Sequence, residues 1–183
     1  MAYKNKVIRN PVTGHEMRFL QTAADTGGQL LEIEATYHVA SKPPALHYHP
    51  MQDEVFTVLE GSLTVQLGNE LKQLHVGDTL HIPSNTVHAM WNPATAKAVV
   101  NWQVRPALST EHFLETGTGL AADGKVNDNG MPPLLQVALL AKKFSNVFRL
   151  AKPSYGIQKT LFRVLSPIAY LSGYRSTYKK YLD

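Results

Sequence analysis

The chain has 183 residues, of which 44% are hydrophobic, a formal net charge of +4 and no cysteine. A chain of this length forms one domain, or one domain with an appendage, and it can bury a substantial core without cross-links. The lack of cysteine excludes disulfides and thiolate-held metals, so any bound metal must use histidine, carboxylate, other oxygen or thioether ligands.

The N-terminal sequence MAYKNKVIRNPVTGHEM lacks the apolar core of a signal peptide. We also find no run of about 18 apolar residues, so we expect no transmembrane helix. Both observations predict a soluble, cytoplasmic protein.

Residues 30–105 alternate between short strand-like stretches and turns. Residues 30–39 alternate apolar and polar side chains, and the dipeptide Gly68-Asn69 separates two such stretches as a hairpin signal. The expected strands are residues 30–39, 55–61, 62–67, 70–76, 79–83, 86–91 and 98–104. Closely spaced short strands of this kind predict an antiparallel sandwich or a small barrel.

The pattern of the sequence changes after Arg105-Pro106. Residues 116–133 are rich in Gly, Asn and Asp and are typical of a loop or linker. Residues 133–151 then carry apolar side chains at helical spacing, and Pro153 ends that pattern. Residues 156–182 indicate a second helix, with a kink at Pro167 and the tyrosines 170, 174 and 178 along one face.

The C-terminal part of the chain is strongly basic. Residues 131–183 hold nine Lys or Arg and one acidic residue, Asp183, which gives this segment a charge of +8. Nine basic and thirteen acidic residues remain in residues 1–130, whose charge is therefore −4. This difference in charge predicts that the two segments form two structural parts of the protein.

The stretch HYHPMQDE contains three side chains that can bind a metal. His47 and His49 point to the same face of a strand, because side chains alternate with a period of two. Glu54 has the opposite parity, but residues 50–53 supply a turn that lets it face the histidines from the next strand. His88 is a fourth candidate, and Asn85 lies in the turn before it, at a position where we expect a positive φ angle.

These two stretches resemble the two signature motifs of the cupin superfamily. Fifteen residues separate the motifs, which is the short form found in small single-domain cupins. The sequence departs from the motifs where Ser41 and Asn85 stand in place of glycine, and neither position is a ligand. The matching residues are His47, His49, Glu54 and Gly61 in the first motif, and Gly77, Pro83, His88 and Asn92 in the second.

The resemblance, which extends to small bacterial conserved-barrel cupins, implies an all-β jelly-roll barrel with a C-terminal α-helical extension. We expect the barrel, with its N-terminal strands, in residues 1–110, a linker in 111–132 and the basic helical extension in 133–183. The resemblance also implies one divalent transition metal (Fe, Mn, Ni, Cu or Zn) per chain. The ligands would be His47, His49, Glu54 and His88.

Four protein ligands leave one or two positions open on a five- or six-coordinate ion, as a catalytic site requires. The resemblance therefore implies a metal-dependent, dioxygenase-type enzyme acting on a small organic molecule. An isomerase or lyase, or a non-catalytic binding or sensor protein, is the alternative, because ligands alone do not make an enzyme.

Further residues are expected near the site. Phe56, Val58 and Met90 would form an apolar wall, and Asn92 is either a donor behind the ligands or a turn residue. The sequence does not decide whether the side chain of Trp102 points into the barrel or away from it. The other histidines lack partners at comparable spacing and are expected on the surface or behind the ligands; these are His15, His38, His75, His81 and His112.

Besides a small-molecule ligand we expect a homodimer, because exposed sheet edges invite association. The C-terminal helices are expected to pack on the barrel or on the dimer partner. Contact with a membrane surface is the less favoured alternative, because it would require a free apolar face beside the basic residues. Nucleic-acid binding is not expected, since apolar residues interrupt the basic ones.

Overall fold

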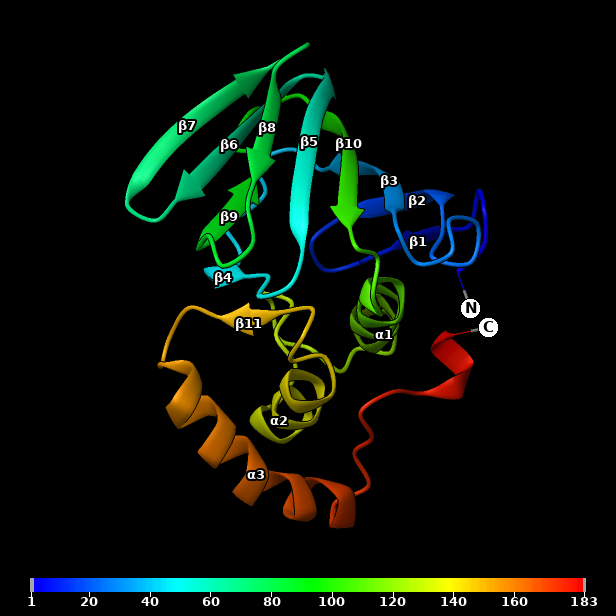
Figure 1. Ribbon diagram of the computed structural model, residues 1–183, viewed down its shortest axis with the longest axis vertical. Helices are drawn as coiled ribbons and strands as arrows, with labels where there is room; N and C mark the ends of the chain where they lie inside the picture. Colours follow the sequence, from blue (N-terminus) through cyan, green and yellow to red (C-terminus); the bar gives the residue numbers. More distant parts are fainter. Residues whose placement is uncertain (1, 183) are drawn as a thin grey trace.

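The computed structural model describes residues 2–182 as two antiparallel β-sheets with helices at one end (Figure 1). The six-stranded sheet has the order β1 (Val7–Arg9), β2 (Glu16–Gln21), β3 (Leu31–Tyr37), β10 (Ala98–Arg105), β5 (Asp53–Glu60) and β8 (Thr79–Ile82). The five-stranded sheet has the order β11 (Arg149–Leu150), β4 (His47–Tyr48), β9 (His88–Trp91), β6 (Ser62–Leu67) and β7 (Glu70–His75).

The alternation in the sequence places one side of each central strand in the core. In β3, for example, Leu31, Ile33 and Ala35 are fully buried, whereas the residues between them are partly exposed. The buried residues of the two sheets form one continuous hydrophobic cluster. The prediction of an all-β jelly roll with C-terminal helices is therefore confirmed.

The turns follow the expected chemistry. Gly68 has a φ of 56° in the turn of the β6–β7 hairpin, where Leu67 pairs with Glu70. Asn85 has a φ of 63°, as its place before His88 predicted. Its backbone N–H donates to the carbonyl of His49 at 2.8 Å, so this turn also fixes the distance between the two motifs.

The expected linker at residues 111–132 is wrong in its first half, where the chain forms helix α1 (Thr110–Ala122). Tertiary contacts override the weak helix propensity of its glycines. Glu115 accepts a hydrogen bond from Lys6 Nζ at 2.7 Å, and Glu111 accepts one from the backbone of Ala23 at 3.1 Å. Residues 123–133, which follow α1, are irregular.

The basic segment forms helices α2 (Leu134–Lys143) and α3 (Tyr155–Leu171) and the short 3₁₀ helix η1 (Lys179–Tyr181). The expectation that one helix continues to residue 182 is wrong. Gly173 has a φ of 85°, and the backbone N–H groups of Gly173 and Tyr174 donate to the carbonyls of Tyr170 and Ala169. This Schellman pattern ends α3, so the later tyrosines do not share a helix face.

The extension also contributes a strand to the barrel. In β11, Leu150 pairs with His47 and Arg149 pairs with Tyr48. The backbone N–H of Ala151 continues the contact by donating to the carbonyl of Leu46 at 2.9 Å. Residues 133–182 are therefore not purely helical, and part of them belongs to the sheet that carries His47.

We predict that Gly61→Ala destabilises the protein by about 3 kcal/mol, because it combines a positive φ with overpacking. Gly61 has a φ of 73°, and a Cβ there would lie 2.3 Å from the carbonyl oxygen of Lys97. Gly68→Ala is the matched control, since its φ is also positive but nothing lies within 4 Å; it should cost about 1 kcal/mol. Urea unfolding in the presence of a chelator measures both, and equal losses would contradict the prediction.

Candidate metal centre

Three histidine side chains converge between the ends of two neighbouring strands. His47 in β4 is paired with His88 in β9, and His49 follows β4 directly. One ring nitrogen from each of the three histidines lies within 4.8 Å of the others. The structure therefore brings together all three histidines that the sequence singled out.

Each of these imidazoles is oriented by a backbone carbonyl. Nδ1 of His47 lies 3.0 Å from the carbonyl oxygen of Ala45. Nδ1 of His49 lies 2.5 Å from that of Val147, and Nδ1 of His88 lies 2.9 Å from that of Thr86. A carbonyl only accepts hydrogen bonds, so Nδ1 carries the proton of the neutral ring and Nε2 then keeps its lone pair. This is how proteins usually fix the tautomer of a metal-binding histidine.

Glu54 in β5 joins this cluster from the other sheet. It is 1% exposed, and its Oε2 lies 3.3 Å from His49 Nε2 and 3.0 Å from His88 Nε2. Its Oε1 accepts a hydrogen bond from Trp102 Nε1 at 2.9 Å. The side chain of Trp102 therefore points into the barrel, which the sequence had left open. Because the indole binds Oε1, Oε2 is the carboxylate oxygen that faces the histidines.

The donor atoms fit a divalent transition metal. His49 Nε2 is buried and has no hydrogen-bond partner among residues 2–182, and such an orphaned buried atom is costly. Two ligands that each lie about 2.1 Å from an ion are about 3.0 Å apart at a right angle. The separations from Glu54 Oε2 to the two imidazoles match that value, and mixed imidazole and carboxylate ligation suits Fe, Mn, Ni, Cu or Zn.

The electrostatics of the cluster favour neutral imidazoles at two positions. Burial, together with the neighbouring His88 and His49, lowers the pKa of His47 to about 3, and burial also lowers the pKa of His49. Burial opposes the charge of Glu54, but the contacts with the three histidines outweigh it and lower the pKa of the carboxyl. Burial likewise acts against protonation of His88, but Glu54 outweighs it and raises the pKa of His88.

A cavity of about 170 Å³ adjoins the cluster. Phe56 and Met90 line it, as expected of an apolar wall, whereas Val58 is buried in the core and is not part of the lining. The complete lining consists of His15, Tyr37, Pro44, His47, Glu54, Phe56, His88, Met90, Trp102 and Leu114.

His15 and Tyr37 are two polar residues of this cavity that sequence reasoning did not place there. The ring of His15 lies 4.5 Å from the ring of Tyr37, and the buried Nε2 of His15 has no hydrogen-bond partner among residues 2–182. Burial lowers the pKa of His15 to about 4, so the ring is neutral at pH 7. The sequence carries no signal for it, because its neighbours in the cavity come from distant strands.

Asn92 is placed in a turn rather than in the cavity. Its side-chain amide donates to the carbonyl of Ala96 at 2.7 Å, and its Oδ1 accepts from the backbone of Ala94 at 3.0 Å. Of the remaining histidines, three are exposed and one, His112, is partly buried on α1. The exposed ones are His38, His75 and His81.

Comparison with known proteins agrees with this architecture. Residues 34–104 match the family described as cupin domain. The chain is 33% identical over 79 residues to quercetin 2,3-dioxygenase of Bacillus subtilis (strain 168), a match that covers 43% of this chain and 23% of that protein. It is 39% identical over 59 residues to the uncharacterized protein MJ1618 of Methanocaldococcus jannaschii, covering 32% and 46%. The match thus spans less than half the length of either relative.

A solved structure shares the fold at low sequence identity. An RmlC-like cupin from Shewanella frigidimarina superposes with a TM-score of 0.50 and 18% identity. The superposition covers 61% of this chain and 94% of that one. This likeness supports the fold of the barrel and carries no information on the reaction.

We predict that His49→Ala and His88→Ala each lose most of a bound divalent metal, because each removes one of the convergent Nε2 atoms. His81→Ala is the matched control, since its side chain is 56% exposed and lies outside the cluster. Elemental analysis of protein purified without a nickel column measures the metal, and circular dichroism checks the fold. Full metal content in a folded double variant would refute a site at these residues.

We predict that Trp102→Phe weakens metal binding by about 10- to 100-fold, because removing a partner that orients a ligand has this effect. The phenyl ring can still stack on Phe56, whose ring is 5.6 Å from that of Trp102, but Glu54 loses its donor. Trp91→Phe is the control, since Trp91 is not part of the cavity lining. Competition with a chelator gives both affinities, and an unchanged affinity in Trp102→Phe would contradict the role given to the indole.

Proposed function

We propose that this chain, whose residues 34–104 match the cupin domain family, is a metal-dependent, dioxygenase-type enzyme acting on a small organic molecule. The observation that carries the proposal is the orphaned, buried Nε2 atom of His49, which faces the carboxylate of Glu54 in a donor set that borders a cavity. A cluster that served only to stabilise the fold would satisfy its polar atoms and leave no adjoining space.

His47, His49, Glu54 and His88 would hold one ion and leave one or two positions for other ligands. A bound divalent transition metal supplies a Lewis acid that polarises a substrate oxygen and, in the case of Fe, Mn, Ni or Cu, a redox centre for chemistry with dioxygen. The donor set does not select among these metals, because their ligand preferences overlap.

The surrounding residues prepare the site in three ways. The indole of Trp102 holds the carboxylate of Glu54 in place, so that Oε2 faces the imidazoles. Phe56, Met90 and Leu114 give the cavity apolar surfaces that exclude water from the substrate. His15 offers an unpaired Nε2 that can exchange a hydrogen bond with a polar group of the substrate.

The size of the cavity favours a small substrate, or the reactive end of a larger one. Its volume of about 170 Å³ is below the roughly 300 Å³ at which sites for drug-sized ligands begin. A second hollow of about 530 Å³ lies between residues 11–14, 38–44 and 128–129 and shares Pro44 with the inner cavity. A longer substrate would place its unreactive part in this outer hollow.

The partial similarity to a quercetin dioxygenase favours an oxygen-using reaction over the alternatives. An isomerase or lyase would use the same donor set, and so would a sensor that binds a small molecule without turnover. The three possibilities differ in whether oxygen is consumed and whether the ligand is changed.

We also propose that the protein forms a homodimer. Strand β7 lies at the end of the five-stranded sheet and strand β1 at the end of the six-stranded one, and such edges present unpaired backbone groups. Leu71 on β7 is among the exposed large hydrophobic residues. Light scattering tests this proposal, and a monomeric mass at all concentrations would exclude it. The cytoplasmic location expected from the sequence stays a prediction.

We predict that the metal-loaded protein consumes oxygen with one member of a panel of quercetin, other flavonols, diketones and thiols. His88→Ala should abolish uptake. His15→Phe should keep the metal but lower kcat/KM by about fivefold to tenfold, the value of one hydrogen bond. An oxygen electrode and chromatography of the product measure both effects.

The same experiment separates the alternatives. Conversion of a ligand without oxygen uptake would replace the dioxygenase by an isomerase or lyase. Saturable binding without conversion, across metal-loaded preparations, would leave a sensor as the function.

A further inference from the structure

Helix α3 has two apolar faces, and only one of them is covered. Phe162 and Ala169 are buried where α3 packs on α2, together with the side chains of Gln158 and Ser166. Figure 1 shows α3 at the outer edge of the molecule, with α2 between it and the sheets. The face of α3 that points away from α2 therefore also points away from the sheets (Figure 1).

That outer face carries a continuous apolar stripe. Its five residues follow the alternating spacing of four and three that lines up side chains along one side of a helix. The exposed fraction rises to 63% at Val164 and 90% at Leu171, and the stripe is about 21 Å long at 1.5 Å per residue. The stripe consists of Ile157, Leu161, Val164, Ile168 and Leu171.

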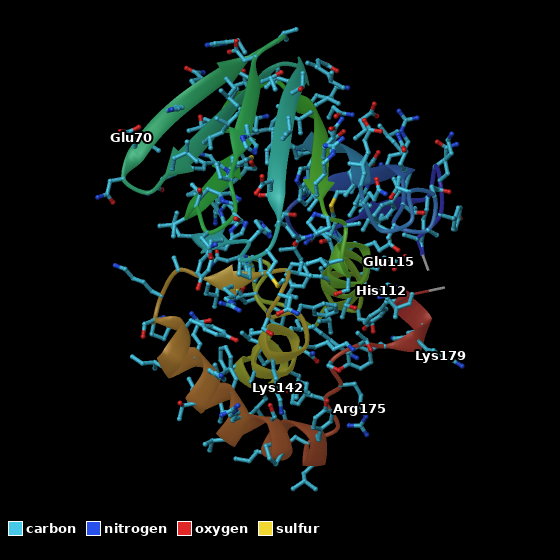
Figure 2. The ribbon with its side chains drawn as sticks, in the orientation of Figure 1. Glu70, His112, Glu115, Lys142, Arg175 and Lys179 are labelled. Atoms are coloured by element: carbon cyan, nitrogen blue, oxygen red, sulfur yellow. The ribbon has the colours of Figure 1, made fainter. Side chains whose placement is uncertain are left out.

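The charge of the C-terminal segment indicates what covers the stripe. Within residues 131–182 there are nine basic residues and no acidic one. On α3 itself the charged side chains are Lys159 and Arg163, which are exposed. Figure 2 shows Lys142 and Arg175 at the helical end of the molecule, whereas Glu70 lies at the opposite end on β7.

A second copy of the chain is a poor partner for this stripe. Helices that pair through such a seam place opposite charges along its edges, but two copies of α3 would bring only lysine and arginine together. An anionic surface with an apolar interior complements both the stripe and the basic residues. No helix in residues 2–182 is long and apolar enough to cross a membrane.

We infer that α3 docks flat on an anionic lipid surface. The apolar stripe enters the boundary between headgroups and acyl chains, and the long basic side chains at this end of the molecule, Arg163 of α3 among them, reach the lipid headgroups. This inference is independent of the reaction at the metal centre. It also reverses the order of preference set by the sequence, because the free apolar face that a membrane contact requires is present.

Co-sedimentation of the full-length protein with vesicles tests the inference. Vesicles of phosphatidylglycerol and phosphatidylcholine in equal parts should bind the protein, and vesicles of phosphatidylcholine alone should not. Binding should weaken as salt rises from 0.1 M to 1 M, because the Debye length falls from about 10 Å to about 3 Å. Arg163→Gln should weaken binding and reduce this dependence on salt.

Val164→Asp and Val76→Asp form a matched pair, since the two valines are 63% and 64% exposed and only the first lies on the stripe. Val164→Asp should lower vesicle binding by about tenfold or more, and Val76→Asp should leave it unchanged. An unbound wild type, or an equal loss in both variants, would overturn the inference. A further outcome would identify a different role for the stripe. If the wild type does not bind vesicles and Val164→Asp converts a dimer into a monomer, the stripe is an interface between two copies of the chain.

Discussion

The structure is organised around a carboxylate that is buried inside a barrel. Removing a charge from water costs several kcal/mol unless other groups compensate for it. For Glu54 the compensation comes from the indole of Trp102 on one oxygen and from two imidazoles near the other. These partners lie on different strands, so the carboxylate is satisfied only when both sheets are correctly assembled. The contacts that stabilise the buried carboxylate therefore both favour the correct pairing of the two sheets and position Glu54 in the candidate site.

Features that depend on nearby residues could be predicted from the sequence. Alternation identified the strands, Gly68-Asn69 identified a hairpin, and the spacing of the histidines identified the cluster. Features that depend on distant contacts could not. Helix α1 exists because its acidic residues find partners elsewhere, and His15 reaches the cavity from a segment with no motif. The end of α3 had a local signal in Gly173, which the tyrosine spacing concealed.

The division into a barrel and an appended helical segment is too simple for this protein. The carbonyl of Val147 holds the ring of His49, and β11 extends the sheet beside His47. The segment between α2 and α3 thus orients two of the candidate ligands, while α3 itself faces outward. One side of the extension serves the metal centre, and the other side presents the apolar stripe.

The partnership between His49 and Val147 spans 98 positions of the chain, and this separation has a consequence for the timing of biosynthesis. A ribosome releases the N-terminal part of a chain first, and domains begin to fold as they emerge. The two signature motifs leave the ribosome well before residue 147 has been added. During that interval the imidazole of His49 lacks the carbonyl that selects its tautomer. The candidate metal centre is therefore complete only near the end of translation.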